Sequence, residues 1–330
     1  MKFSNTGILS PKRNEMIADI LHLDIENPFR QKTFRGTIHA IGVGLHSGKN
    51  AKITFHPAPV GTGIVFRRTD VTDKNNEILA SYKNVVDTRM CSCFGNKDGV
   101  VIGTTEHLMA ALNAYGVTNA YIDVTGPEIP IMDGSAKAFA FLFDCVGVIE
   151  QEEVLKAIVV KKEVSFTDDK GVTASLSPEK EDFIMDFSID FPARAIGHQE
   201  CSFKLSQKAF KEEIAYARTF GNLQEAEALR KMGLGQGASL ENAVVVDGDR
   251  IVNPEGLRDQ KEFVRHKILD AIGDLYQAGM PIIGHFKGNR SGHYHNNMLL
   301  RELFKDSSNY EIVDLNEYYK KMNIRATAVA

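Results

Sequence analysis

The stretch Phe263-Val-Arg-His-Lys-Ile-Leu-Asp-Ala-Ile-Gly-Asp-Leu275 is the most clearly periodic segment of the chain. Its apolar residues recur at the spacing of one helix face, so we expect a helix over residues 261–278. On a second stripe, His266, Asp270 and Asp274 follow one another at intervals of four residues. An imidazole and a carboxylate one turn apart can bind a metal ion, but they are also typical of an ion pair on a solvated face. Taken alone, the segment favours the ion pair.

The segments around this helix indicate an α+β fold, because strands and helices follow one another without regular βαβ units. Short apolar runs between turn residues predict strands at 33–40, 51–58, 63–67, 120–124, 157–161, 172–176, 183–191, 243–246 and 281–287. Helical spacing predicts further helices at 208–217, 223–232 and 296–304, and two that begin at Thr104, as the cap, and at Ser135. Residues 84–94 fit neither pattern. In each half, strands therefore precede a pair of helices.

Length and composition favour a globular protein of two domains. With 330 residues, of which 43% are hydrophobic, the chain is too long for one typical core and too apolar for a disordered protein. The expected segments are an N-terminal extension (1–29), a first domain (30–150), a second domain (151–315) and a C-terminal tail (316–330). The charged run Gln151–Glu153 is expected as the linker, and residues 16–23 as a weak helix within the extension.

Charge and targeting signals exclude several classes of partner. The net charge of −4 gives no basic field for nucleic acid or an anionic membrane. The longest apolar run, Ala138–Phe143, is too short to cross a bilayer, and the N-terminus lacks the apolar segment of a secretory signal. Four cysteines are too few for a disulfide framework. These features indicate a soluble protein of a reducing compartment, without nucleic acid or stable membrane insertion. We further expect a cytoplasmic monomer with a small-molecule substrate.

Two tempting motifs do not meet their patterns. In Gly42-Val-Gly-Leu-His-Ser-Gly48, the next residues are Lys49 and Asn50, whereas a Walker loop requires Gly-Lys-Ser/Thr. The same glycines are spaced one residue too far apart for the G-x-G-x-x-G dinucleotide fingerprint. Cys91-Ser-Cys93 suggests half of a metal knuckle, but no second cysteine pair exists, so packing or a role in an access loop is favoured.

Two further segments carry chemically useful residues. In Thr104-Thr-Glu106-His107, at the start of a helix, His107 can be a ligand while Glu106 acts from the side. The alternative is an acidic residue favoured by the helix dipole beside a buried histidine. His293 and His295 follow a strand in the Gly/Ser-rich loop 288–295, for which the alternative is an ordinary surface loop. Each segment alone favours its alternative.

Together, the three segments supply a full set of groups for metal-assisted hydrolysis. His107, His266 and Asp270 give three ligands, the number that a catalytic zinc site uses. Glu106 supplies a base, and His293 supplies an acid that the carboxylate of Asp274 can orient. Lys267 supplies a cation for a developing oxyanion. This inventory is typical of the hydrolysis of an amide or an ester. Because the ligands lie about 160 residues apart, spacing alone does not show that they converge.

At these residues the chain closely resembles the LpxC family, the zinc-dependent UDP-3-O-acyl-N-acetylglucosamine deacetylases of lipid A synthesis in Gram-negative bacteria. The matching stretches run in family order from about residue 31 to about residue 305. They are Gly42–Lys49, Phe66–Asp70, Thr105–Leu112, Pro127–Ala136, Ala217–Gly221, Phe263–Leu275 and Ser291–His293. The resemblance implies two domains, each a sheet layered against two helices, with the active site in the cleft between them.

The resemblance also implies a role for each matching residue. The zinc ligands would be His107, His266 and Asp270. The catalytic groups would be Glu106 as general base, His293 as general acid oriented by Asp274, and Lys267 and Thr219 as stabilisers of the oxyanion. The residues near the substrate would be Phe220 and Phe191 at the sugar and nucleotide, Arg290 in place of a family lysine at the diphosphate, and Cys91 as a further contact.

Residues 221–246 match the family's insert, whose apolar passage holds the acyl chain, with Ala238 where the family usually has glycine. The resemblance therefore implies a zinc metalloamidase that releases acetate from UDP-3-O-(3-hydroxyacyl)-N-acetylglucosamine. Two alternatives stay open. One is a metallohydrolase for another N-acyl sugar, and the other is a nucleotide-sugar binding protein without turnover.

Overall fold

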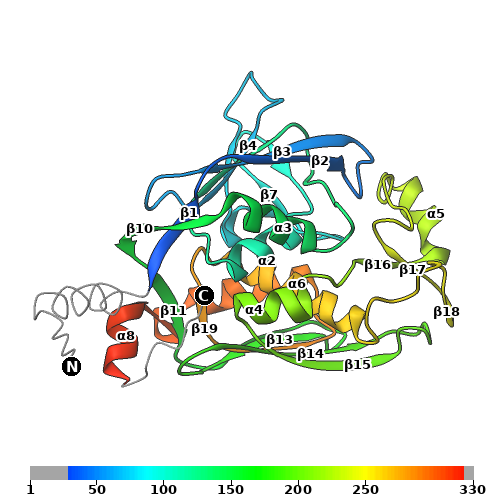
Figure 1. The fold of residues 1–330 in the computed structure, drawn as a ribbon. Coiled ribbons are helices and arrows are strands. Elements are labelled where there is room, and N and C mark those ends of the chain that lie inside the picture. Colours follow the sequence, from blue (N-terminus) through cyan, green and yellow to red (C-terminus); the bar gives the residue numbers. More distant parts are fainter. Residues whose placement is uncertain (1–28, 323–330) are drawn as a thin grey trace, which may run out of the picture.

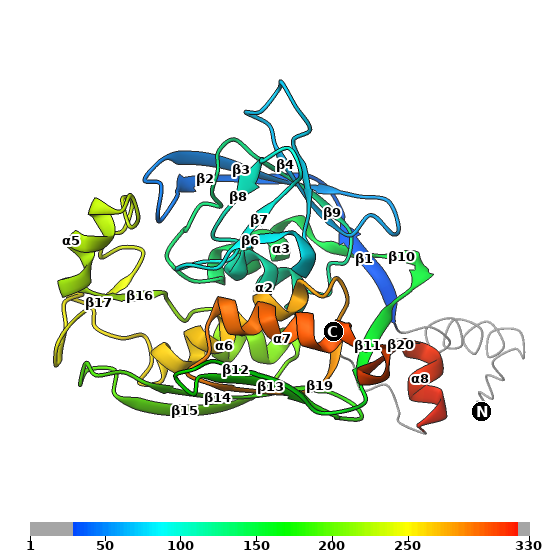
Figure 2. The ribbon, with the colours of Figure 1, turned by 180° about the vertical axis from the view of Figure 1, so that it is seen from behind.

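The computed structural model describes residues 29–322 and has the expected α+β architecture. Two large sheets form the outer layers, and α2, α4, α6 and α7 lie between them, as opposite views show (Figure 1, Figure 2). The weak helix expected at 16–23 lies outside the described residues. Within residues 29–322, no helix is both long and apolar enough to cross a membrane.

The first half of the chain builds a five-stranded sheet in the order β2-β3-β9-β4-β5. Its strands are β2 (Ile38–Val43), β3 (Asn50–Pro57), β4 (Ile64–Arg68), β5 (Glu77–Leu79) and β9 (Ala120–Val124). Every second residue of β4 and β9 is buried, because one face of this sheet packs on the core. The helices α2 (Glu106–Ala114) and α3 (Lys137–Val146) lie on that face (Figure 1).

Two smaller sheets complete this half. The ambiguous stretch 84–94 follows a 3-10 turn at Tyr82–Asn84 and contains β6 (Val85–Asp87) and the start of β7 (Cys93–Gly95). These strands form a three-stranded sheet in the order β6-β7-β8, in which β8 is Val101–Ile102. β1 (Arg30–Phe34) pairs with β10 (Val148–Val154). The charged run expected as the linker therefore lies within a paired strand, at the register shift opposite Arg30 and Lys32, and its two glutamates are exposed.

The second half builds a seven-stranded sheet, with β12-β13-β19-β11-β20 as its main path and β14 and β15 beside β19. Its strands are β11 (Lys156–Val160), β12 (Val164–Thr167), β13 (Thr173–Ser177), β14 (Phe183–Asp190), β15 (His198–Lys204), β19 (Ile282–Asn289) and β20 (Tyr310–Asp314). The sequence pattern does not predict β15, in which polar residues dominate, or β20, a short strand with a charged residue on each side of its two aliphatic residues. Each pairs along its whole length with a more apolar neighbour.

The helix α6 (Glu262–Tyr276) is the central element of the layer between the sheets. It packs against α2, α7 (His293–Lys305), β14 and β15, so it is covered on nearly every side. His266 and Asp270 are each 3% exposed, and Asp274 is completely buried. The solvated ion pair favoured by the sequence of α6 alone is therefore wrong.

Gly273 lets α2 and α6 approach each other closely. A β-carbon at this position would collide with the carbonyl oxygen of Glu106 and would lie 3.0 Å from the backbone nitrogen of Ala110. The contact brings the first turn of α2 against α6. It thereby joins side chains that lie far apart in the sequence.

Two local expectations are corrected. Thr104 does not cap α2, because it adopts a left-handed φ of 56° and its hydroxyl donates to Glu128. The cap residue is Thr105, whose side chain makes no capping hydrogen bond. The helix expected at 208–217 is a short α4 (Gln207–Ala209) followed by a π-helical turn over Phe210–Ile214.

The remaining elements lie at opposite ends of the helical layer (Figure 1). At one end, β16 (Phe220–Asn222), α5 (Leu223–Lys231), β17 (Val244–Asp247) and β18 (Arg250–Ile251) occupy the region of the expected insert. At the other, α8 (Leu315–Lys321) takes up part of the expected tail. Its Leu315 and Tyr319 pack with Phe29 in a small separate core.

Candidate active site

Three buried side chains from two helices meet where α2 packs on α6. His107 lies in the first turn of α2, and His266 and Asp270 lie one turn apart on α6. One potential ligand atom from each lies within 4.8 Å of the others. Asp270 Oδ1 is 3.3 Å from His266 Nε2 and 3.5 Å from His107 Nε2. The structure thus brings together the three residues expected as metal ligands.

The surroundings of these side chains fit a zinc ion. Asp270 Oδ1, which faces both histidines, is buried without a hydrogen-bond partner among the described residues, which is unusual for a buried polar atom. His266 Nδ1 lies 3.0 Å from the carbonyl oxygen of Ala217, so Nδ1 carries the proton and Nε2 keeps its lone pair. Burial lowers the pKa of His266 to about 3, which keeps the ring neutral. Two imidazoles and a carboxylate are a donor set of catalytic zinc sites.

Lys267 places a partly buried cation beside these ligands. Its Nζ donates a hydrogen bond of 2.6 Å to Asp270 Oδ2. Burial alone would lower the pKa of Lys267, but the negative charge of Asp270 outweighs burial and raises it. The ammonium group therefore stays charged and is available to stabilise negative charge that develops nearby.

Glu106 is a buried carboxylate at the start of α2. Its Oε2 accepts a hydrogen bond of 2.9 Å from the backbone nitrogen of Ser92. Burial raises the pKa of Glu106, although the neighbouring imidazoles of His293 and His107 oppose the rise. A carboxylate with a raised pKa, on the wall of the same cavity as His107, is suited to general-base chemistry near neutral pH.

His293 begins α7 and is paired with Asp274 of α6. Its Nδ1 lies 2.9 Å from Asp274 Oδ2. Asp274 also accepts hydrogen bonds from Ser92 Oγ at 2.6 Å and from Asn296 Nδ2 at 2.9 Å. Burial alone would lower the pKa of His293, but the negative charges of Asp274 and Glu106 raise it to about 10. The alternative of an ordinary surface loop is therefore wrong for His293, which is partly buried at the start of α7 and held by Asp274. With its raised pKa, the imidazole is suited to donate a proton.

Sequence reasoning missed Ser92 and Asn296. Ser92 contacts the carboxylates of both Glu106 and Asp274, through its backbone nitrogen and its hydroxyl, respectively. It lies in the segment whose pattern is ambiguous, and a single serine or asparagine has no spacing that would reveal its role.

A cavity of about 450 Å³ opens beside these groups. Thr219, Phe220 and Phe191 are part of its wall, and the two rings meet edge to face with centroids 5.5 Å apart. The wall also includes apolar side chains on and near the insert, namely Ile196, Leu229, Ala238 and Ala243. Leu45 and His46, from the rejected glycine-rich motif, line it as well. The cavity therefore combines reactive groups with an apolar side.

Two expected substrate contacts do not line this cavity. Arg290 is exposed, and its guanidinium group lies 3.4 Å from the carbonyl oxygen of Gly171. Cys91 is buried, with its Sγ 3.6 Å from that of Cys93. Of the two histidines in segment 288–295, only His293 lines the cavity, because His295 turns to Asp168 at 3.1 Å.

Comparisons with known proteins show which family the chain is similar to. Residues 31–305 match the family model of UDP-3-O-acyl N-acetylglycosamine deacetylase. A UDP-3-O-acyl-N-acetylglucosamine deacetylase of Acidithiobacillus ferrooxidans is 48% identical over 292 residues, which cover 87% of this chain and 94% of the relative. Proteins of the same name from Hydrogenovibrio crunogenus (46% identical, covering 87% of this chain and 95% of the relative) and Phenylobacterium zucineum (48%, covering 83% and 92%) are similar over nearly the same length. The family match includes every residue of the site.

Proposed function

The chain belongs to the LpxC family of UDP-3-O-acyl-N-acetylglucosamine deacetylases, and we propose that it hydrolyses the acetamide of UDP-3-O-(3-hydroxyacyl)-N-acetylglucosamine at a zinc site. The products are acetate and the free amine, and the reaction is a committed step of lipid A synthesis in Gram-negative bacteria. One observation carries the proposal: three buried potential ligands, the buried carboxylate of Glu106 and the partly buried His293 share the wall of one cavity.

His107, His266 and Asp270 are the proposed zinc ligands. A zinc ion bound there acts as a Lewis acid toward the amide oxygen and lowers the pKa of water. Glu106 accepts the proton of the attacking water, for which its raised pKa is suited. This proton transfer promotes formation of the new C–O bond.

The remaining groups stabilise the oxyanion and release the amine. The ammonium group of Lys267 and the side chain of Thr219 stabilise the negative charge that develops on the amide oxygen. His293, held by Asp274 at 2.9 Å, donates its proton to the departing nitrogen as the C–N bond breaks. The proton that Glu106 accepts and the proton that His293 donates balance the hydrolysis.

The substrate is proposed to lie along the cavity. Its acyl chain follows the apolar wall that includes Leu229 and Ala238, and its sugar contacts Phe191 and Phe220. Arg290 is outside the cavity wall but exposed, so its guanidinium group is free to pair with a diphosphate that extends beyond the cavity.

The finer organisation is also a proposal. We assign residues 30–150 and 151–315 to two domains with the active site between them, since each half builds a large sheet and both halves supply cavity residues. We further propose that the protein acts as a cytoplasmic monomer on a small-molecule substrate, without nucleic acid. The net charge of −4 and the lack of a membrane-spanning helix within residues 29–322 are compatible with this assignment.

Acetate release from matched substrates tests the proposed function. Wild type, Glu106→Gln and Glu163→Gln, an exposed glutamate used as the control, would be given the UDP-linked acylated sugar or the same sugar without nucleotide. We expect zinc-dependent acetate release from the UDP-linked compound by wild type and Glu163→Gln, and almost none by Glu106→Gln. Equal turnover without the nucleotide would favour a metallohydrolase of another N-acyl sugar. Tight binding without acetate release would favour a binding protein.

A further inference from the structure

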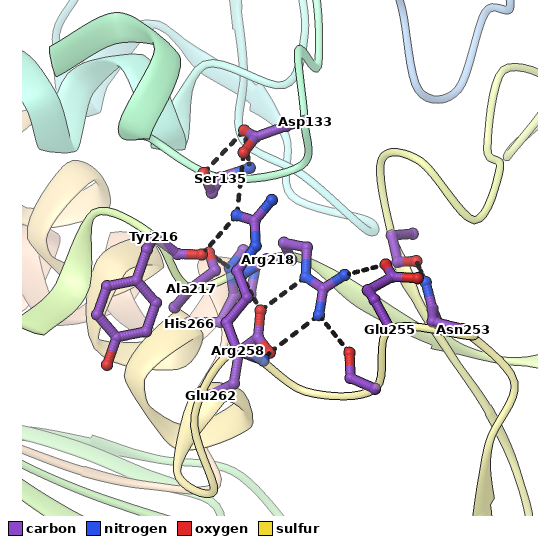
Figure 3. Close-up of polar contacts among 12 residues, drawn as sticks. Asp133, Ser135, Tyr216, Ala217, Arg218, Asn253, Glu255, Arg258, Glu262 and His266 are labelled. Carbon is purple, nitrogen blue, oxygen red and sulfur yellow. Dashed lines mark hydrogen bonds and ion pairs between the residues drawn. The ribbon is translucent and has the colours of Figure 1, made fainter. Parts of the chain in front are cut away.

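A buried ion pair lies one helix turn before His266, at the start of α6. Arg218 is 1% exposed and Glu262, the first residue of α6, is completely buried. The guanidinium group donates to Glu262 through Nε at 2.8 Å and Nη2 at 3.2 Å, and further to Glu255 and the carbonyl of Gly256 (Figure 3). The carboxylate of Glu262 also accepts from the backbone nitrogen of Arg258 at 2.7 Å. Because both charges are buried, this arrangement holds Glu262 in one orientation.

A single peptide group connects this ion pair to His266. The carbonyl oxygen of Ala217 accepts from His266 Nδ1 at 3.0 Å. The N–H of Arg218, which belongs to the same peptide plane, donates to Glu262 Oε1 at 3.1 Å. Glu262 and His266 are one turn apart on α6, so the peptide plane bridges two side chains of one helix face (Figure 3). Rotation of this plane would break both bonds at once.

We propose that Glu262 and Arg218 are positioning residues for the zinc ligand His266, an inference that rests on the proposed function. Glu262 holds the N–H of the peptide between Ala217 and Arg218. The carbonyl of the same peptide fixes the tautomer and the ring orientation of His266. A carboxylate that accepts from the N–H also polarises the peptide and strengthens its carbonyl as an acceptor. Partners that orient metal-bound histidines in this way typically contribute 10- to 100-fold to metal affinity.

Further hydrogen bonds of the segment Tyr216–Thr219, which contains the Ala217–Arg218 peptide, support a positioning role. Arg258 donates to the carbonyl of Tyr216 at 2.9 Å and to Asp133 at 2.9 Å, and the backbone nitrogen of Thr219 donates to the carbonyl of Gly134 at 2.7 Å. The segment from Tyr216 to Thr219 is therefore held against α6 and against the turn before α3. This segment supplies both the acceptor for His266 and the side chain of Thr219 on the cavity wall.

Zinc affinity tests the inference. The full chain and its Glu262→Gln variant would compete for zinc with a chromogenic chelator, and the free energy of unfolding would be measured in parallel. We expect a 10- to 100-fold loss of zinc affinity in the folded variant. An affinity within about twofold of wild type would overturn the inference, because residues that orient a metal-bound histidine normally change metal affinity by more than this.

The variants Arg218→Lys and Arg68→Lys separate an effect on zinc affinity from an effect on the free energy of unfolding. They also test the inference if Glu262→Gln does not fold. Arg68 is another nearly buried arginine, 8% exposed, whose Nε and Nη2 each lie 2.8 Å from Asp70. Its third guanidinium bond goes to the carbonyl of Val101, so within residues 29–322 none of these bonds reaches a site residue. We expect Arg218→Lys to lose zinc affinity and Arg68→Lys to keep it, even where both lose stability. An equal loss of affinity in both variants, or in neither, would contradict the positioning role.

The tautomer of His266 gives a readout that requires no zinc. In the zinc-free protein, the ring ¹⁵N shifts of wild type are expected to show a proton on Nδ1, and Arg218→Lys to show a mixture of tautomers. If wild type neither binds zinc nor releases acetate, the proposed function fails and this measurement alone decides the inference. An unmixed Nδ1–H tautomer in Arg218→Lys would then overturn it.

Discussion

Gly273→Ala tests the helix contact on which the site depends. The added β-carbon would meet the backbone of Glu106 at its carbonyl carbon at 2.8 Å and Ala110 N at 3.0 Å, and it would collide with the Glu106 carbonyl oxygen. These neighbours are backbone atoms of α2, so no side-chain rotation relieves the overlap. An ordinary contact distance of 3.4 Å between the new β-carbon and the carbonyl carbon of Glu106, in place of 2.8 Å, requires α2 and α6 to separate by about 0.6 Å.

The expected cost is larger in activity than in stability. Overpacking of this kind typically costs about 1–3 kcal/mol, and the better helix propensity of alanine returns about 1 kcal/mol. The separation moves Glu106 and His107 away from His266 and Asp270, and a misplacement approaching 1 Å costs about 100-fold in rate. We therefore expect kcat/KM to fall by about 10- to 100-fold, with weakened zinc binding.

The assay is acetate release together with zinc content and urea unfolding. Gly36→Ala is the matched control, because a β-carbon there would have only Val146 Cγ2 as a neighbour, at 3.9 Å. The control should retain wild-type activity. Wild-type kcat/KM and zinc affinity in folded Gly273→Ala would refute the account of the α2–α6 contact.

Three further variants probe the base, the acid and the fold. Glu106→Gln should keep its zinc but lose activity by about 10²- to 10⁴-fold, because it removes a general base; metal analysis beside turnover checks both. The acid form of His293 exists only below its pKa, which Asp274 and Glu106 raise, so activity should fall as pH rises. Asp274→Asn removes one of these charges and should move the alkaline limb of kcat/KM to lower pH, and an unmoved limb would contradict the pairing. Leu315→Ala should destabilise the protein by about 2–5 kcal/mol in urea unfolding, because it leaves a cavity under α8; kcat at 25 °C should stay unchanged.

Many of the helices and strands can be predicted from local sequence patterns, but the burial of their polar side chains cannot. The periodicity of Phe263–Leu275 identifies α6 correctly, because its apolar residues recur on one face. The same periodicity places Asp270 and Asp274 on a polar stripe, which favours solvent exposure. In the structure, α2 and α7 cover that stripe, and such coverage depends on tertiary packing. Strands such as β15 are missed for a related reason, since their pairing comes from the neighbouring strand.

The site shows the same limit. Glu106, His107, His266 and Asp270 are recognisable as chemically useful types, but their convergence across about 160 residues follows from the resemblance and the fold, not from spacing. Ser92 cannot be found from its pattern, because it acts through a backbone nitrogen and one hydroxyl. Residue types thus suggest the chemistry, and the helix contact assembles it.

The central claim is a zinc-dependent deacetylase whose metal is held by His107, His266 and Asp270. The most direct measurement strips the protein with a chelator, titrates zinc back and follows acetate release from the UDP-linked acylated sugar. The account expects activity to disappear on stripping, to return in proportion to zinc up to one ion per chain, and to stay absent in Asp270→Ala. Full acetate release by the stripped protein, or zinc-restored activity in Asp270→Ala, would contradict it.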